Sequence, residues 1–213
     1  AAVLIEPVQG EGGVRPVPDD FMRRVRARCD EVGALLIVDE VQAGVGRTGE
    51  AFAYMSSKVK PDLMAMAKGM GGGLPVGAMV ATEAVAEALV PGTHGTTYGG
   101  NPLVCAAALT VMRRVLEPTF MASVRARGER LLAGLRRIGE RTGAFREIRG
   151  RGLIVGAEMA DGREAKGVVE AARDRGVLIH VAGPHTLRLV PPLVIDDGHV
   201  DEALDAMEAA MSS

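Results

Sequence analysis

Apolar and polar positions follow a strand, helix, strand order in the first part of the chain. Val3 to Ile5 is a short apolar run that predicts a strand. An amphipathic helix is predicted from Pro18, followed by two aspartates that can cap it, to Gly33, a typical helix end. The run from Ala34 to Val38 is apolar throughout, which is typical of a strand covered on both faces. This order predicts a parallel βαβ unit.

The remaining pattern predicts an α/β region followed by an α+β region. Two more strands are predicted over Asp62 to Ala67 and Pro75 to Ala81, and we place a domain boundary near Thr110. Arginines between Arg113 and Arg151 have helical spacing among leucines, which predicts a solvated helix face. We therefore expect residues 1–110 to be one domain and residues 111–213 a small α+β domain. The other predicted elements are helices at 82–89, 103–116, 119–141, 163–175 and from 197 onward, and strands at 153–159, 177–180 and 187–190.

Composition excludes several classes of function. The chain has 213 residues, of which 47% are hydrophobic and 24% charged, as in ordinary globular proteins. Its net charge of -2 gives no electrostatic case for binding nucleic acid or an anionic membrane, and no apolar run is long enough to span a bilayer. Cys29 and Cys105 lack metal-ligand spacing, which indicates reduced thiols in the cytoplasm and predicts no metal site. The chain begins directly with an apolar strand, so we expect it to be a piece of a longer chain.

Three charged residues follow three predicted strands. Glu6 comes after the first strand, Asp39 ends the second, and Lys68 follows the third. In open α/β sheets, ligands collect at the carboxyl ends of strands, so these side chains are predicted to project over one sheet edge. Lys68 ends an apolar segment that can be buried, and burial can lower a lysine pKa enough to make the amine a nucleophile. An ion pair, an aldolase-like site and a pyridoxal phosphate site all fit this pattern.

Two glycine-rich segments carry weaker signals. Gly44 to Gly49 matches the dinucleotide pattern G-x-G-x-x-G, but it is separated from the strand before it and no long helix clearly follows, so we reject it. The segment from Thr93 to Pro102 is rich in small hydroxyl residues and glycine. Such residues can present hydroxyl and N–H groups to a phosphate, although turns use the same residues.

A more specific signal comes from four segments: Ile5 to Gly13, Val38 to Gly49, Ala67 to Gly73 and Thr96 to Pro102. Together they resemble the motifs of the class III pyridoxal-phosphate aminotransferases, nearest to the acetylornithine and ornithine branches, in the family's order over nearly the whole chain. The resemblance implies the fold-type I fold: a partial large domain with a mostly parallel sheet, followed by a small domain. It also implies that the first half of the family's chain is missing.

The resemblance assigns a cofactor and the residues that bind it. Lys68 would hold pyridoxal 5'-phosphate covalently and then act as a general base. Asp39 would pair with the pyridine nitrogen and keep it protonated; without that ring, another cation is expected beside this carboxylate. Val41 would pack on a ring face and Gln42 would bond the ring hydroxyl, although strand-end packing and a solvated amide explain these two equally well. Thr97 would reach the cofactor phosphate of a neighbouring subunit, which implies a homodimer with a shared active site.

The resemblance also implies a reaction. Arg188 would bind a substrate carboxylate with its two-pronged guanidinium, and Glu11 would pair with Arg188 when the other end of a substrate is bound. Glu6 is a further substrate-binding candidate. The implied activity is cytoplasmic transfer of an amino group from N-acetylornithine, or a related ω-amino compound, to 2-oxoglutarate, in arginine biosynthesis. The alternatives are another class III enzyme acting on ornithine or 4-aminobutyrate, an inert dimerisation or cofactor-binding fragment, and, more distantly, a sugar aminotransferase or other fold-type I enzyme.

Overall fold

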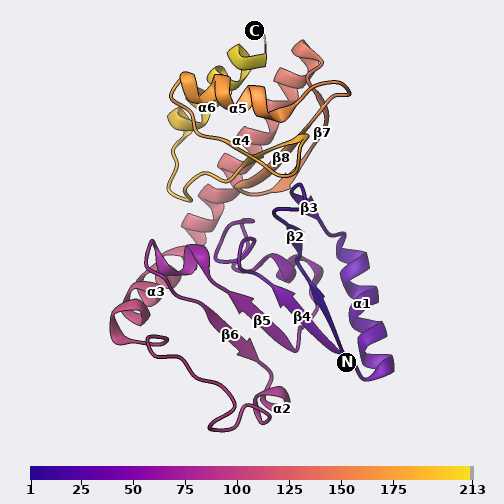
Figure 1. Cartoon of the computed structure of the whole chain (residues 1–213), viewed down its shortest axis with the longest axis vertical. Coiled ribbons are helices and arrows are strands. Elements are labelled where there is room, and N and C mark those ends of the chain that lie inside the picture. Colours follow the sequence, from indigo (N-terminus) through magenta and orange to yellow (C-terminus); the bar gives the residue numbers. More distant parts are fainter. Residues whose placement is uncertain (212–213) are drawn as a thin grey trace. The chain divides into compact units, whose positions relative to one another are not determined.

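The computed structural model describes residues 1–211 and divides them into two compact units (Figure 1). Unit 1 comprises residues 1–7, 17–46 and 50–120, and unit 2 comprises residues 8–16, 47–49 and those from 121 onward. Each unit has its own sheet. The domain boundary near Thr110 stays a prediction.

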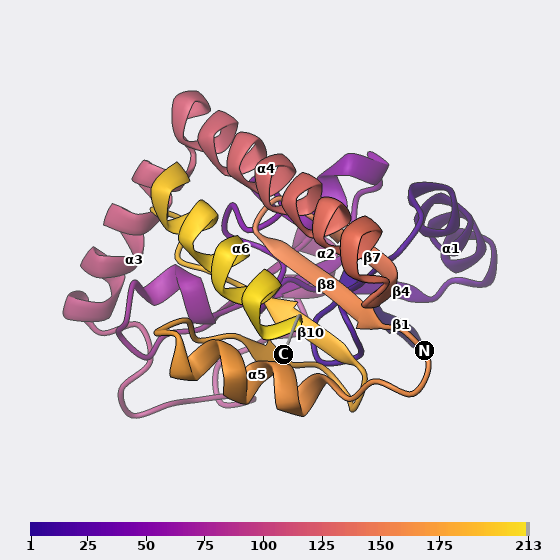
Figure 2. The same ribbon diagram turned by 90° about the horizontal axis from the view of Figure 1, so that it is seen from above.

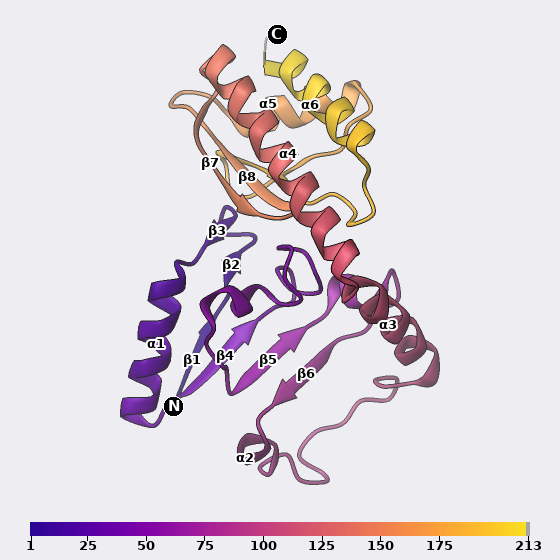
Figure 3. The same cartoon turned by 180° about the vertical axis from the view of Figure 1, so that it is seen from behind.

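Unit 1 is built on a four-stranded sheet in the order β1-β4-β5-β6 (Figure 3). Strands β1 (Ala2–Ile5), β4 (Leu35–Asp39) and β5 (Leu63–Met66) are parallel, whereas β6 (Ala78–Ala81) is antiparallel to β5. Helix α1 (Asp19–Val32) connects β1 to β4, which confirms the predicted βαβ unit. The helix ends at Gly33, where a φ of 67° closes the last turn as predicted.

The prediction that the second strand is covered on both faces is wrong. In β4 only Leu36 and Val38 are buried, and Leu35 is 37% exposed. The reason is that one face packs with α1, through a core that contains Val38 and Met22, while no described residue covers the other face to the same extent. The remaining elements of unit 1 are η1 (Ala53–Ser57), η2 (Lys68–Gly71), α2 (Glu83–Ala86) and α3 (Pro102–Val115).

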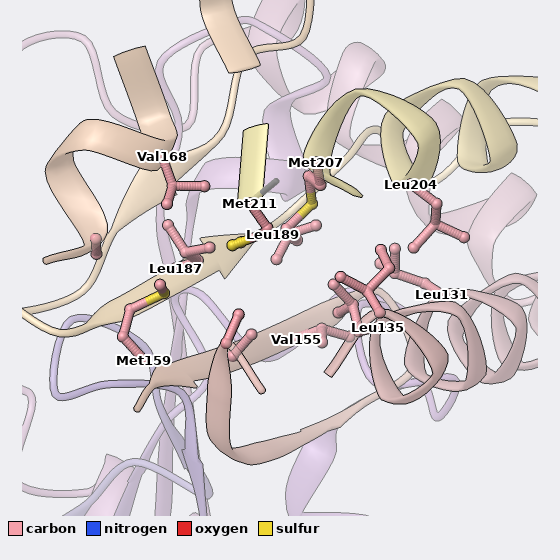
Figure 4. Close-up of a cluster of buried hydrophobic side chains, with 14 of the residues drawn as sticks. Leu131, Leu135, Val155, Met159, Val168, Leu187, Leu189, Leu204, Met207 and Met211 are labelled. Atoms are coloured by element: carbon pink, nitrogen blue, oxygen red, sulfur yellow. The ribbon is translucent and has the colours of Figure 1, made fainter. Parts of the chain in front are cut away.

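Unit 2 holds an antiparallel sheet in the order β7-β8-β10-β9, with its helices on one face (Figure 2). The core between them joins alternate strand residues to apolar residues of the helices (Figure 4). This alternation leaves the intervening strand residues on the opposite face. The elements are β7 (Phe145–Arg151), β8 (Ile154–Met159), β9 (His180–Val181), β10 (Thr186–Leu189), α4 (Pro118–Thr142), α5 (Ala165–Asp174), α6 (Asp197–Met211), and the ribbon of β2 (Val8–Gln9) and β3 (Arg15–Pro16).

The prediction that the arginines up to Arg151 lie on a helix face is wrong for the last of them, because residues Phe145–Arg151 form strand β7. Phe145 and Ile148 both pack against the core of unit 2, although they are three residues apart, as on a helix. The register shifts between Phe145 and Glu147, so an extra residue bulges out and the two apolar side chains reach the same face of a strand. The arginines of β7 therefore belong to a sheet.

Candidate active site

The candidate residues of unit 1 lie at one edge of its sheet. Asp39 is the last residue of β4 and pairs with Ala65 of β5, and the N–H of Glu40 continues the ladder to the carbonyl of Ala65 at 2.9 Å. Lys68 follows β5 after one intervening residue, Ala67. Glu6 directly follows β1, the other neighbour of β4. Because the three strands are parallel, their carboxyl ends meet at the edge where such folds bind ligands.

The carboxylate of Asp39 is available to a cationic ligand. Its Oδ1 accepts a hydrogen bond from the N–H of Val41 at 2.9 Å, which fixes the side chain against the turn that follows β4. No basic side chain among residues 1–211 makes an ion pair with Asp39, although the carboxylate is only partly exposed. Acceptor groups of this kind suit a protonated ring nitrogen, so the residues present fit pyridoxal phosphate.

Lys68 has a strained backbone. Its φ is +40°, a left-handed conformation that is rare outside glycine and costs on the order of 1–3 kcal/mol. The turn that follows is tied to α3, because Gly72 has φ +58° and a Cβ there would lie 2.9 Å from the Val111 side chain. The expectation that Lys68 is buried is wrong for the described residues. Its side chain is exposed, because β5 ends at Met66 and no described element covers Lys68. Lys58 also has a left-handed φ, of +60°, so backbone strain supports a functional role for Lys68 only together with its place just after β5.

Glu40 is a buried residue that the sequence did not single out. Its side chain is fully buried and accepts hydrogen bonds from the backbone N–H groups of Ala53 at 2.9 Å and Tyr54 at 2.8 Å. These N–H groups open η1, where they have no partner within the helix. Burial and, to a smaller extent, the charge of the nearby Asp39 raise the pKa of Glu40 to about 7, against the lowering effect of the two N–H donors. Glu40 thus anchors the start of the turn after β4, next to Asp39, to the beginning of η1.

Three other cofactor-binding candidates follow in the chain, and one of them, Val41, is joined to this edge by its N–H bond to Asp39. Val41 and Gln42 are half-buried in the turn after β4. Thr97 is exposed, in the loop between α2 and α3. Asn101 closes that loop by capping α3, accepting from the N–H of Val104 at 3.2 Å. The cofactor contacts of these three residues stay predictions.

Unit 2 brings together two of the three substrate-binding candidates. Arg188 lies on β10 with its side chain 11% exposed, and its Nη1 forms an ion pair with Oε1 of Glu11, whose side chain is 71% exposed. A guanidinium that is mostly covered and faces an exposed carboxylate can exchange that carboxylate for one on a substrate. The arrangement therefore suits reversible binding of a carboxylate.

Two further findings concern the residues described. None of the helices in residues 1–211 has the length and apolarity needed to cross a membrane. Within the same residues, no group of three or more His, Cys, Asp or Glu side chains could hold a metal ion.

Comparison with known proteins identifies the family. The family model for class III aminotransferases matches residues 1–211. A succinylornithine transaminase/acetylornithine aminotransferase from Pseudomonas aeruginosa is 46% identical over 99% of this chain, and an acetylornithine aminotransferase from Pseudomonas putida is 46% identical over 100% of it. These matches cover 52% and 53% of the two relatives, so the chain spans about half their length.

Solved structures agree with the sequence relatives. The N-acetylornithine aminotransferase of Stenotrophomonas maltophilia superposes on the whole chain with a TM-score of 0.91 and 42% identity, and 56% of that structure is covered. The ornithine aminotransferase of Toxoplasma gondii superposes with a TM-score of 0.93 and 33% identity, with 51% of it covered. The predicted fold-type I class is thereby confirmed. The family model, the sequence relatives and the structural neighbours all agree, and the chain belongs to the class III aminotransferase family.

Proposed function

We propose that this chain is part of an aminotransferase that moves the amino group of N-acetylornithine, or a related ω-amino compound, to 2-oxoglutarate, giving a semialdehyde and glutamate. The observation that carries the proposal is the edge of the unit 1 sheet, where β4 ends at Asp39 beside the strand that leads into Lys68. Within residues 1–211, no basic side chain makes an ion pair with Asp39. Class III aminotransferases depend on pyridoxal phosphate, and a related ornithine aminotransferase structure is described with this cofactor at its active site.

The chain's own residues would divide the work at the cofactor. When bound, pyridoxal phosphate supplies an electron sink for the charge that develops at the substrate carbon. Asp39 would hold the proton on the pyridine nitrogen, and the amine of Lys68 would take the proton from the substrate carbon and deliver it to the cofactor, with the reverse transfer in the second half-reaction. Val41 would pack against the ring, and Gln42 would donate a hydrogen bond to the ring hydroxyl.

Arg188 and Glu11 would select the substrate of each half-reaction. Arg188 binds a carboxylate of 2-oxoglutarate through two parallel N–H donors. In the other half-reaction Glu11 pairs with Arg188, so that an ω-amine without a carboxylate at that end does not leave a bare cation in the pocket. Glu6, which follows β1 at the same sheet edge as Asp39, is a further candidate for substrate binding.

The same proposal includes a homodimer, a cytoplasmic location and a role in arginine biosynthesis. The exposed loop that carries Thr97 supports the dimer, because a hydroxyl presented outward can serve the phosphate of a second copy. The names of the acetylornithine aminotransferase relatives support the biosynthetic role.

Cofactor labelling tests the catalytic assignment. The chain is mixed with pyridoxal phosphate, alone and together with the N-terminal half of a relative, reduced with borohydride and mapped by mass spectrometry. We expect label on Lys68, at least in the complemented sample, and none on Lys58 or Lys60, which are matched lysines outside the site. No label on Lys68 in a folded, complemented sample would overturn the assignment and leave an inert fragment. If the complemented sample transfers the amino group of ornithine or 4-aminobutyrate in preference to that of N-acetylornithine, the proposed amino donor is wrong and the preferred compound takes its place.

A further inference from the structure

Arg149, Gly156 and Arg188 form a row across the sheet of unit 2. Arg149 of β7 pairs with Gly156 of β8, and Gly156 pairs with Arg188 of β10. Residues directly opposite each other on neighbouring strands share a face. The alternate residues Val155 and Leu187 pack in the helix-covered core, so the row lies on the other face. Two arginines therefore flank a position without a side chain.

The segment that carries Glu11 lies over this gap. The carbonyl of Gly13 accepts hydrogen bonds from Nε and Nη2 of Arg149 at 2.9 and 2.7 Å, and the carbonyl of Val14 accepts from Nε at 3.1 Å. A Cβ on Gly156 would lie 2.8 Å from Cβ of Val14 and 3.2 Å from the carbonyl oxygen of Gly13. Only glycine at position 156 leaves room for the segment this close to the sheet.

The segment is held in a strained conformation. Val14 is fully buried and has a φ of +51°, which is unusual for a β-branched residue. Such a conformation persists only when the surroundings determine it. The surroundings here are the side chain of Arg149, 8% exposed, which is fixed by Glu158 at 2.5 Å and Glu147 at 2.6 Å. The segment is also tied to the sheet through Arg15, which lies 3.4 Å from Glu158.

The ion pair of Glu11 with Arg188 is too exposed on the Glu11 side to hold the segment by itself. Exposed ion pairs contribute little to stability, whereas the contacts of Arg149 are nearly buried. Arg188 stands on a strand with hydrogen-bonded neighbours on both sides, so its position is set by the sheet. The variable that decides whether the two charges meet is thus the position of the segment from Gly10 to Arg15.

We propose that Arg149 and Gly156 are positioning residues that place Glu11 against Arg188 and thereby set the preference for ω-amine donors over α-amine donors. The inference rests on the proposed function. If the segment moves, Glu11 no longer neutralises Arg188, and donors that lack a carboxylate at that end bind less well. Glutamate and 2-oxoglutarate, which use Arg188 directly, bind as before.

The test compares two half-reactions in the complete protein in which this chain occurs. The variants are Arg149→Met, Arg149→Lys and Gly156→Ala. The controls are Arg146→Met, which removes a more exposed arginine bound to the same Glu158, and Gly167→Ala, where an added Cβ meets nothing within 4 Å. Single-turnover absorbance gives kcat/KM for N-acetylornithine and for glutamate. We expect the ratio of the two to fall at least about 10-fold in Arg149→Met and Gly156→Ala, partial recovery in Arg149→Lys, and less than a twofold change in the controls.

A second measurement does not depend on activity. Hydrogen–deuterium exchange of the peptide that spans residues 9–16 is expected to be faster in Arg149→Met and Gly156→Ala than in the controls. Equal losses in both half-reactions, or an unchanged ratio in all three variants while Glu11→Ala changes it, would overturn the inference and leave the proposed function intact. A wild-type protein that transfers no amino group would instead refute the proposed function.

Discussion

Glu40 makes the sharpest prediction about stability. Its side chain is fully buried, and both carboxylate oxygens accept backbone N–H groups. Burial raises its pKa from 4.5 to about 7 despite the opposing effect of the N–H donors of Tyr54 and Ala53, and the charge on Asp39 adds to the rise. The test therefore measures the free energy of unfolding as a function of pH. It compares the wild-type chain with Glu40→Gln, which has no titrating group at position 40.

The size of the effect follows from linkage. In the unfolded chain Glu40 loses its proton near pH 4.5, whereas in the folded chain it keeps the proton until about pH 7. Between these values the folded state binds more protons, so the free energy of unfolding falls as pH rises. At about 1.4 kcal/mol per pKa unit, the change across this window is about 3 kcal/mol.

Glutamine at position 40 changes the starting point as well as the slope. It has one carbonyl oxygen, so one of the N–H groups of Ala53 and Tyr54 loses its acceptor, at a cost of about 1–3 kcal/mol. At pH 4.5 the wild-type chain is expected to be more stable than Glu40→Gln by this amount. By pH 7.5 the advantage is expected to have disappeared or reversed.

Urea unfolding followed by circular dichroism at half-unit steps from pH 4.5 to 7.5 measures this difference. Comparing each variant with wild type at the same pH cancels the titration of every other group. Glu50→Gln is the matched control, because Glu50 is an exposed carboxylate in the same unit. A stability difference between wild type and Glu40→Gln that stays constant across the window, or that grows with pH, would refute the reasoning.

Three further substitutions test the site and the fold. Asp39→Asn is expected to lower kcat by about 100-fold or more, which is the usual loss when an enzyme loses one preorganised electrostatic group. The same substitution is expected to weaken cofactor binding in an absorbance titration. Arg188→Lys is expected to raise KM for 2-oxoglutarate about 10-fold, because a point charge replaces a two-pronged donor; an unchanged KM would remove Arg188 from the carboxylate site. Gly152→Ala is expected to lower the free energy of unfolding by about 2 kcal/mol, since its Cβ would lie 2.5 Å from the carbonyl carbon of Thr48. The Gly167→Ala variant, in an open position on α5, is its control and should unfold no more easily than wild type.

The part of the site that lies in unit 1 could be predicted because its signals are local. The helix between Pro18 and Gly33 is marked by its own periodicity and its terminal glycine, and the short apolar runs around it predict strands. Once β1, β4 and β5 are recognised as parallel, the residues after them must meet at one edge. Glu6, Asp39 and Lys68 follow from this rule without any knowledge of packing.

Glu40 could not be found in this way. Its role depends on the N–H groups of Ala53 and Tyr54, which only the folded path of the chain brings to it. A second carboxylate after Asp39 at a strand end reads as an ordinary polar residue. Gly44 leaves room for Glu40, because a Cβ at position 44 would lie 2.9 Å from Cβ of Glu40 and 2.7 Å from the backbone carbonyl oxygen of Glu40. That closeness is a property of the folded turn and is not visible in the sequence.

The carboxylate site of unit 2 depends on a register that no single segment encodes. In an antiparallel sheet, a slip of one residue would turn every side chain of β10 to the other face. Leu187 and Leu189 would then leave the core, and Arg188 would enter it without a partner, at a cost of several kcal/mol. The apolar packing under the helices thus holds Arg188 on the opposite face, in line with Gly156 and Arg149. Under the proposed function, the same core that stabilises unit 2 decides which charged groups face the substrate, and substitutions in that core are expected to alter carboxylate binding as well as stability.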